Sequence, residues 1–315
     1  MKGSSTREMI ERFLKGDRLI AARVISMVED EMPEGQDILD LLYGRVGAAH
    51  RIGITGPPGA GKSTIVDQMA LRLRKEDIKI GIIAADPSSP FTGGAFLGDR
   101  IRMADIATDE AVFIRSLATR GNSGGLPRTA EDICDVLDAF GKDALIIETA
   151  GVGQTELEII HAADTAVVVL VPESGDSIQA MKAGLMEIGD VFCINKSDRE
   201  GADRAASILE EALELKGNVA WKPPVLKTVA TEGAGIDELI DRVRDHRKYL
   251  AEHGLVERKR KERIESKILT AVRERILNPV LEEVKRDLSS KVEKVYLTEI
   301  TPTQAVEEIL QGLDL

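Results

Sequence analysis

The residues from Gly56 to Ser63 have the types and the spacing of a phosphate-binding loop. The segment Gly56-Pro57-Pro58-Gly59-Ala60-Gly61-Lys62-Ser63 fits the pattern GxxxxGK[ST], and Thr64 extends it. The glycines let backbone N–H groups turn toward phosphate oxygens, and the N-terminus of a following helix adds positive potential. We expect Lys62 to bind the β- and γ-phosphates and to act in catalysis, and the Ser63 hydroxyl to ligate Mg²⁺.

A second short motif, Asn195-Lys196-Ser197-Asp198, has the residues that read a guanine base. An Asp198 carboxylate would accept hydrogen bonds from N1–H and the 2-amino group of guanine. Adenine lacks this pair of donors, so the motif favours GTP and GDP over adenine nucleotides. The stem of Lys196 would pack on the purine. Val229-Ala230-Thr231 is a candidate second base loop, which lacks the usual serine before the alanine and would therefore act through its backbone.

Three acidic residues lie at or just after the ends of expected strands, and they are candidate magnesium ligands together with Ser63. They are Asp86, Asp99 and Glu148. Ligands of a parallel sheet gather at the carboxyl ends of its strands, and oxygen ligands suit Mg²⁺. The alternative for Asp86 and Asp99 is that each only caps a turn or a helix.

The segment Glu148-Thr149-Ala150-Gly151 is suited to sense the γ-phosphate, because the backbone N–H of Gly151 can approach it. Glu148 stands where an Asp is more usual. Asp86 is a candidate to position the attacking water and Gln154 is a weaker one. The sequence does not decide between them, so slow intrinsic hydrolysis is expected.

Short apolar runs that alternate with amphipathic segments predict the elements that position these residues. The expected strands are Arg51–Thr55, Ile78–Ala84, Val112–Leu117, Ala144–Glu148, Ala166–Val171, Val191–Ile194 and Val225–Val229. The expected helices between them are Ser63–Lys75, Arg128–Phe140, Ile178–Ile188 and Arg204–Leu215. This alternation predicts an α/β fold of the P-loop NTPase type, with a mostly parallel sheet covered by helices on both faces.

Helical extensions are expected at both ends of this α/β region. Residues 1–45 predict two amphipathic helices separated at Gly16-Asp17, residues 46–254 form the nucleotide-binding domain, and residues 255–315 form a helical dimerisation region. An apolar stripe from Ile264 to Leu288 must bury against something, and Pro279 should kink or divide its helix. The basic run 258–261 is interpreted as a solvated helix face, although an anionic partner is the alternative.

The composition excludes several other classes of protein. The net charge of −12 argues against bulk binding to nucleic acid or to an anionic membrane. The two cysteines form no CxxC pattern, which argues against a disulfide framework or a zinc site. We find no secretory signal and no apolar run long enough to cross a bilayer, so a cytoplasmic location is expected.

Several motifs together resemble the MeaB/ArgK-type GTPases, the accessory proteins of methylmalonyl-CoA mutase. The matching segments are Gly16-Asp17-Arg18 with Ala22-Arg23 and Glu29, GPPGAGKST, DPSSP, Gly98–Met103, ETAGVGQTE, NKSD and EGAGI at Glu232–Ile236. They follow one another in order over nearly the whole chain. The similarity is loosest after about residue 255.

The resemblance implies a GTPase of the SIMIBI class that binds GTP, GDP and Mg²⁺ and forms a homodimer through its C-terminal helices. It implies a role in loading, protecting or repairing the cofactor of an adenosylcobalamin-dependent acyl-CoA mutase. It supports Asp86, Asp99 and Glu148 as magnesium-site residues. It also marks Glu173–Lys182 as a loop that couples the nucleotide state to the partner, with Lys182 as a residue that acts in the stimulated reaction.

Three alternatives remain open at this point. One is a nickel-delivery GTPase, although the four histidines are scattered along the chain. Another is the protein-kinase label given to some ArgK relatives, which the NKSD motif and the absence of kinase motifs disfavour. The third is a nucleotide-gated scaffold whose hydrolysis is incidental.

Overall fold

A computed structural model describes residues 2–86, 104–118, 126–127, 129–151, 158–172, 184–215 and 220–312. The chain divides into two compact units, Met1–Lys259 and Arg260–Leu315. The first unit contains both nucleotide motifs together with the N-terminal helices.

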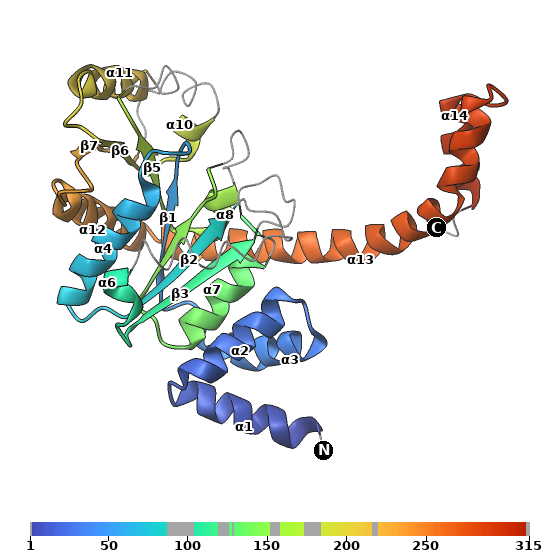
Figure 1. The fold of residues 1–315 in the computed structure, drawn as a ribbon, viewed down its shortest axis with the longest axis horizontal. Helices are drawn as coiled ribbons and strands as arrows, with labels where there is room; N and C mark the ends of the chain where they lie inside the picture. Colours follow the sequence, from blue (N-terminus) through green and yellow to red (C-terminus); the bar gives the residue numbers. More distant parts are fainter. Residues whose placement is uncertain are drawn as a thin grey trace. The chain divides into compact units, whose positions relative to one another are not determined.

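The centre of the first unit is a seven-stranded sheet with the strand order β3-β2-β4-β1-β5-β6-β7, in which all neighbouring strands are parallel (Figure 1). The strands are β1 (His50–Thr55), β2 (Ile80–Asp86), β3 (Val112–Ala118), β4 (Ala144–Glu148), β5 (Thr165–Leu170), β6 (Val191–Asn195) and β7 (Val225–Thr228). All seven strands were predicted, with ends that differ by at most two residues and with β4 matched at both ends. The parallel α/β fold is therefore confirmed.

Side chains alternate between two hydrophobic cores, one on each face of the sheet, as the pleat of a strand requires. On β4, Ile146 packs into one core while Leu145 and Ile147 pack into the other. The Ile146 core is covered by α4 (Lys62–Lys75), α6 (Ala104–Ala107) and α12 (Ile236–Glu252). The opposite core is covered by α7 (Ala130–Ala139), α8 (Ile159–Ala162), α10 (Leu185–Ile188) and α11 (Ala202–Glu214).

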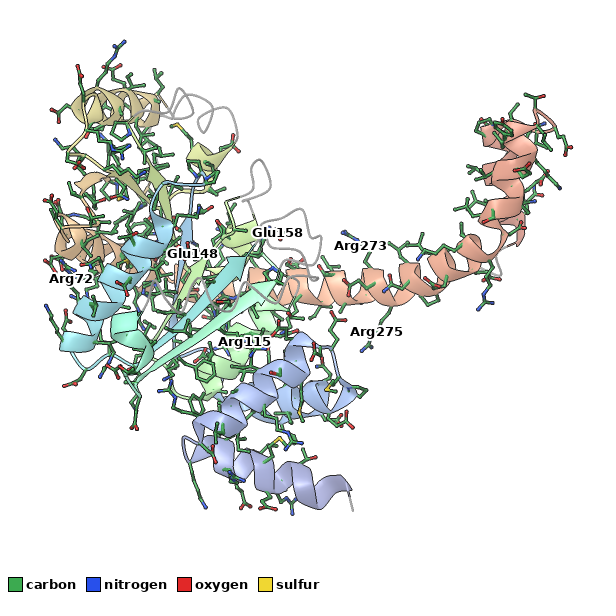
Figure 2. All side chains as sticks on the ribbon, viewed as in Figure 1. Arg72, Arg115, Glu148, Glu158, Arg273 and Arg275 are labelled. Atoms are coloured by element: carbon green, nitrogen blue, oxygen red, sulfur yellow. The ribbon has the colours of Figure 1, made fainter. Side chains whose placement is uncertain are left out.

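Three helices, rather than the two expected, form the N-terminal extension: α1 (Lys2–Leu14), α2 (Arg18–Glu29) and α3 (Pro33–Leu42), followed by the short helix η1 (Tyr43–Arg45). Asp17 caps α2 by accepting hydrogen bonds from the amides of Leu19 and Ile20. Helices α2 and α3 pack on α7 and extend its core. An ion pair between Glu29 and Arg115, of which Figure 2 labels Arg115, also joins α2 to β3. The extension is therefore packed against the α/β core.

Helices α13 (Leu255–Tyr296) and α14 (Pro302–Gly312) form the C-terminal part. Of the kink or division predicted at Pro279, the division is wrong, because α13 continues through it as one helix of 42 residues (Figure 1). Proline removes one backbone hydrogen bond, but no residue of α13 is buried, so water can solvate the released carbonyl. The apolar stripe is exposed in the single chain, with Ile268 and Leu269 each 56% accessible.

Candidate functional site

The phosphate loop joins β1 to α4, and its glycines adopt conformations that other residues rarely reach. Gly56 has φ +140°, and a Cβ there would lie 2.0 Å from the carbonyl oxygen of Val169 on β5. Gly61 has φ +91°, and a Cβ there would lie 2.3 Å from Nδ2 of Asn195. The loop is therefore pressed against both β5 and the guanine motif, and glycine is required at these two positions.

Lys62 opens α4, and its side chain folds back over the phosphate loop. Its Nζ donates hydrogen bonds to the carbonyl oxygens of Gly56 at 2.8 Å and Pro57 at 3.2 Å. A Cβ on Gly151 would lie 2.5 Å from the same Nζ. The structure thus brings Lys62 together with the expected γ-phosphate sensor, although the two are distant in the sequence.

The structure also brings together Ser63 and Glu148, two of the predicted magnesium ligands. The Ser63 hydroxyl donates a 2.6 Å hydrogen bond to Oε1 of Glu148, which lies at the carboxyl end of β4 (Figure 2). A hydroxyl beside a carboxylate is a donor set that fits Mg²⁺, since this ion prefers oxygen ligands and retains several waters. These residues would hold the ion beside the phosphates, where it would neutralise charge that develops during phosphoryl transfer.

Asn195 connects the guanine motif to the phosphate loop and to the second base loop. Its Nδ2 donates to the carbonyl oxygen of Ala60 at 2.8 Å, and its Oδ1 accepts from the amide of Ala230 at 3.1 Å. The hydroxyl of Thr228 donates to the same oxygen at 3.1 Å. The two segments predicted to contact the base are therefore side by side, and their assignment as base loops stays a prediction.

The residues after Asn195 turn toward solvent. Lys196 adopts φ +58°, which is unusual for a residue with a side chain, and Asp198 is exposed. The amide of Ser197 donates to the carbonyl oxygen of Thr228 and holds this turn on β7. Asp198 is thus free of the core and accessible to a base, as its predicted role requires.

Several predicted site residues lie outside what the structure describes. These are Asp99, Lys182, Gln154 and the side chain of Asp86, whose backbone ends β2. Among the described residues, no group of three or more His, Cys, Asp or Glu side chains could hold a metal ion. Of the three predicted carboxylates, only Glu148 can be placed, so the full magnesium site remains a prediction.

Sequence reasoning missed the hydrogen bonds among small polar residues beneath the site. Thr55 and Thr149 share a 3.0 Å hydrogen bond between the ends of β1 and β4. Cys193 and Thr228 share one of 3.1 Å beneath Asn195, and burial raises the pKa of the Cys193 thiol to about 12. Cys193 is therefore an inert packing group. The available signal was position, because Thr55, Thr149 and Thr228 lie at or just after the carboxyl end of a strand and Cys193 lies two residues before the end of β6.

The fold and the phosphate loop together define the class. A parallel sheet whose β1 runs through a glycine-rich loop into α4, with lysine and serine at the helix start, is a P-loop NTPase. The NKSD motif at the end of β6 places it among the GTPases within that class.

The comparison with protein families agrees with this class. Residues 21–285 match the family model described as methylmalonyl Co-A mutase-associated GTPase MeaB. The chain belongs to this family of SIMIBI-class GTPases, and it is a GTP hydrolase.

Relatives resemble the chain over most of its length. It is 48% identical to a putative GTPase of Pyrococcus abyssi over 97% of this chain and 96% of the relative. It is 36% identical to the GTPase ArgK of Escherichia coli over 86% of this chain and 85% of the relative. Among solved structures, one described as LAO/AO transport system kinase superposes with a TM-score of 0.76 at 28% identity, over 98% of this chain and 97% of the other.

Proposed function

We propose that this chain is a magnesium-dependent GTPase that serves an adenosylcobalamin-dependent acyl-CoA mutase and controls the loading, protection or repair of its cofactor. The observation that carries the proposal is the family match over residues 21–285, which includes both nucleotide motifs. A relative named methylmalonic aciduria type A homolog, from Mus musculus, supports it at 30% identity over 95% of this chain.

In this proposal the described residues bind and orient the nucleotide. Lys62 exchanges its bonds to Gly56 and Pro57 for bonds to the β- and γ-phosphates. The bound Mg²⁺ would be held by Ser63 and Glu148, with Asp86 and Asp99 as the further predicted ligands. Asp198 reads the guanine, and the backbone of Gly151 responds to the γ-phosphate.

The coupling to the mutase is assigned to the segment Glu173–Lys182, which lies outside the described residues. It follows β5, the strand against which Gly56 of the phosphate loop is pressed. In the proposal this segment responds to the γ-phosphate and to a partner in turn, and the resulting linkage is reciprocal.

The test is GTP hydrolysis with and without a purified acyl-CoA mutase. We expect the mutase to raise the rate for the wild type, and Lys182→Ala to bind GTP normally but to lose most of this stimulation. Lys248→Ala is the matched control, because Lys248 is a 75% exposed lysine on α12. Equal stimulation of Lys182→Ala and the wild type would remove the loop from the proposal. If no candidate mutase stimulates the wild type, the partner assignment is wrong although the GTPase remains.

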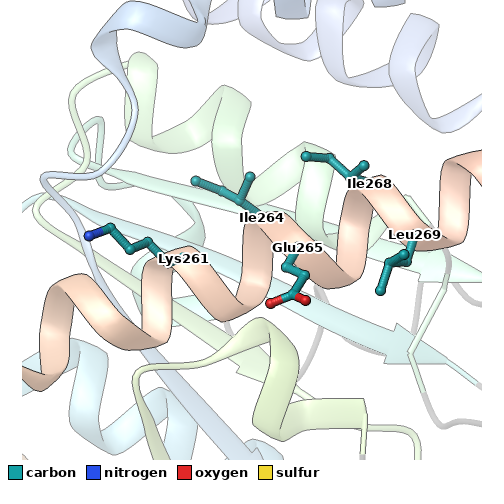
Figure 3. A pocket seen from close by; sticks show the side chains of 5 residues that line it. All are labelled: Lys261, Ile264, Glu265, Ile268 and Leu269. Carbon is teal, nitrogen blue, oxygen red and sulfur yellow. The ribbon is translucent and has the colours of Figure 1, made fainter.

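The proposed homodimer is supported by the exposed apolar face of α13. Figure 3 shows one hollow on this face, lined by Lys261, Ile264, Glu265, Ile268 and Leu269. A second copy would cover the same stripe on both chains. In light scattering, Leu269→Asp combined with Leu277→Asp should give monomers or insoluble protein, whereas Leu215→Asp, at an 89% exposed site in the first unit, should give neither. A monomeric wild type at micromolar concentration would reject the dimer.

The scaffold alternative predicts a different result, namely partner binding that depends on nucleotide but is unaffected when hydrolysis is blocked. The nickel-delivery alternative gains no support from the part of the chain that the structure describes, where no group of three metal-ligating side chains forms. No helix among the described residues is long and apolar enough to cross a membrane.

A further inference from the structure

Arg72 reaches from the phosphate-loop helix to the loop that follows the second base segment. It lies on α4, the helix that Lys62 begins (Figure 2). Its NH2 donates a 2.8 Å hydrogen bond to the carbonyl oxygen of Gly233, and its Nε lies 2.9 Å from Oδ1 of Asp237. Its NH1 donates to the carbonyl oxygen and to Oε1 of Gln68, at 3.1 and 2.8 Å. One guanidinium therefore joins α4 to the β7–α12 loop at Gly233 and to the first turn of α12 at Asp237, while Gln68 on α4 holds its NH1.

The loop that Arg72 contacts is a tight turn that contains the predicted base segment. Val229 and Ala234 form an isolated antiparallel bridge, with the amide of Val229 donating to the carbonyl oxygen of Ala234 at 3.1 Å. Inside this turn the amide of Gly233 donates to the carbonyl oxygen of Ala230 at 3.2 Å. Gly233 thus binds Ala230 through its N–H and Arg72 through its C=O.

These contacts belong to a chain of hydrogen bonds that runs from Arg72 on α4 to Ala60 in the phosphate loop. Arg72 donates to the carbonyl oxygen of Gly233, the amide of Gly233 donates to the carbonyl oxygen of Ala230, and the amide of Ala230 donates to Oδ1 of Asn195. Asn195 in turn donates to the carbonyl oxygen of Ala60 in the phosphate loop, just before α4 begins. The base segments are therefore held on two sides, by the phosphate loop at Ala60 and by α4 at Arg72.

The chemistry of the contact favours arginine over lysine and glycine over alanine. A guanidinium has five donors in a rigid fork and can bind several acceptors in fixed directions, whereas an ammonium on a flexible stem cannot. Gly233 has φ +72°, and a Cβ there would lie 2.3 Å from NH2 of Arg72. The backbone at Gly233 approaches the arginine closely because no side chain intervenes.

We propose that Arg72 is a positioning residue for guanine binding, which fixes the 229–235 loop on α4 and so slows nucleotide release. The inference rests on the proposed assignment of Asn195–Asp198 and Val229–Thr231 as base-binding segments. Arg72 does not touch the phosphate-binding groups, so its loss weakens the hold on the base while the chemical step at the γ-phosphate is preserved.

The matched control is Arg74, on the same helix. Arg72 and Arg74 are each 19% exposed and each form one ion pair with an aspartate. Arg74 binds Asp109 at 2.8 Å and the carbonyl oxygen of Ile78 at 3.0 Å, away from the base loop. Arg74→Met and Arg72→Met should therefore lower the melting temperature similarly and differ only in nucleotide binding.

The experiment measures release of a ribose-labelled fluorescent GDP by stopped flow, with KM and kcat for GTP from the same full-length proteins. We expect Arg72→Met to release GDP about tenfold faster and to raise KM similarly, which matches the loss of a hydrogen bond from a charged donor. Its kcat should stay within about twofold, because uniform binding affects KM alone. Arg72→Lys should retain part of the slow GDP release of the wild type. Gly233→Ala should speed GDP release and raise KM, as Arg72→Met does.

Equal effects of Arg72→Met and Arg74→Met on release would overturn the proposal, because Arg72 would then act only through stability. A fall in kcat at unchanged KM would also overturn it, since Arg72 would then act on the phosphate loop. Asp198→Asn, which should change the preference from guanine to xanthine nucleotides, tests the base-site assignment separately from the role of Arg72. If Asp198→Asn shows this change while Arg72→Met leaves GDP release and KM unchanged, the Arg72 proposal alone fails. If Asp198→Asn keeps its guanine preference, the base-site assignment fails and the Arg72 proposal fails with it.

Discussion

The carboxyl ends and the amino ends of the parallel strands lie on opposite sides of the sheet, called here the carboxyl edge and the amino edge. Both carry buried polar groups, but the hydrogen-bond partners of these groups differ in kind. At the carboxyl edge, Lys62 is bonded to two backbone carbonyls of a glycine-rich loop. At the amino edge, the hydroxyl of Thr165 lies 2.9 Å from Nε2 of His50 and 2.9 Å from Nδ1 of His246. A phosphate can replace loop carbonyls as the partner of an ammonium group, whereas a side-chain network of this kind is complete without a ligand.

The amino-edge network also extends to the start of the long helix. His246 Nε2 lies 3.3 Å from Oδ1 of Asp190, and Lys259 Nζ lies 3.5 Å from Oδ2 of the same carboxylate. Lys259 further donates to the carbonyl oxygen of Asp164 at 2.7 Å. The interpretation of residues 258–261 as a solvated face is thus wrong for Lys259, because this lysine anchors the beginning of α13. The difference between the two edges is that a ligand can replace the backbone carbonyls bound to Lys62, whereas the side chains at the amino edge already satisfy one another.

The largest expected effect is the loss of Lys62 from the carboxyl edge. Lys62→Ala should weaken GTP binding about a hundredfold or more, because a buried charged partner of the phosphates is removed. Isothermal titration with GTP and GDP measures the change, and circular dichroism checks that the fold is kept. Lys259→Ala, at the amino edge, should leave the GTP affinity nearly unchanged. A similar loss in both variants would erase the distinction between the edges.

A smaller effect is expected from the pair that would hold magnesium. Glu148→Ala and Ser63→Ala should raise the Mg²⁺ concentration needed for half-maximal hydrolysis about ten- to a hundredfold, by analogy with other changes around metal ligands. Titration of Mg²⁺ in a phosphate-release assay measures this. Normal hydrolysis by Glu148→Ala at low Mg²⁺ would show that Glu148 has been misassigned.

The smallest effect is the pH dependence of the amino edge. Burial lowers the pKa of His50 and of His246 to about 4 each. The unfolded chain takes up protons as the pH falls through about 6.5, whereas the folded chain resists until about pH 4, so stability falls across this window. We expect each histidine to contribute a loss of about 1–2 kcal/mol between pH 6.5 and pH 5.

Urea unfolding at several pH values, followed by circular dichroism, measures this loss. His246→Gln should flatten the pH dependence, although it will lower stability at neutral pH by breaking the bond to Thr165. His253→Gln is the control, because His253 is exposed at the end of α12. A pH slope that is the same in His246→Gln and wild type would mean that the network does not control it.

Most of the carboxyl edge could be predicted from the sequence, because its signals are local. The phosphate loop needs glycines at fixed offsets, and buried parallel strands need short apolar runs, so the seven strands could be predicted and Lys62, Ser63 and Glu148 could be named as candidate site residues. The third N-terminal helix was not predicted, and it carries Gly35 in its first turn. The packing of this helix on α2 requires glycine at position 35, since a Cβ there would lie 2.8 Å from the backbone of Met27.

The long-range polar contacts could not be predicted from the sequence. Nothing in the pattern around His50 or His246 indicates that Thr165 joins them, since 115 residues separate His50 from Thr165 and 81 separate Thr165 from His246. Arg72 likewise meets Gly233 across a separation of 161 residues. Such pairs depend on which helix covers which face of the sheet, and that is settled by packing over the whole unit.

By itself, the sequence determined the class of fold, the phosphate loop and the guanine motif, because each needs particular residues at short, fixed spacings. Only the tertiary structure decided that Asn195 joins the two predicted base segments to the phosphate loop, that Arg72 is bonded to the second of these loops from α4, and that the amino edge is closed by its own histidines. The physical reason is that a hydrogen bond is made by atoms that meet within about 3 Å, and for distant segments only the folded chain brings them that close.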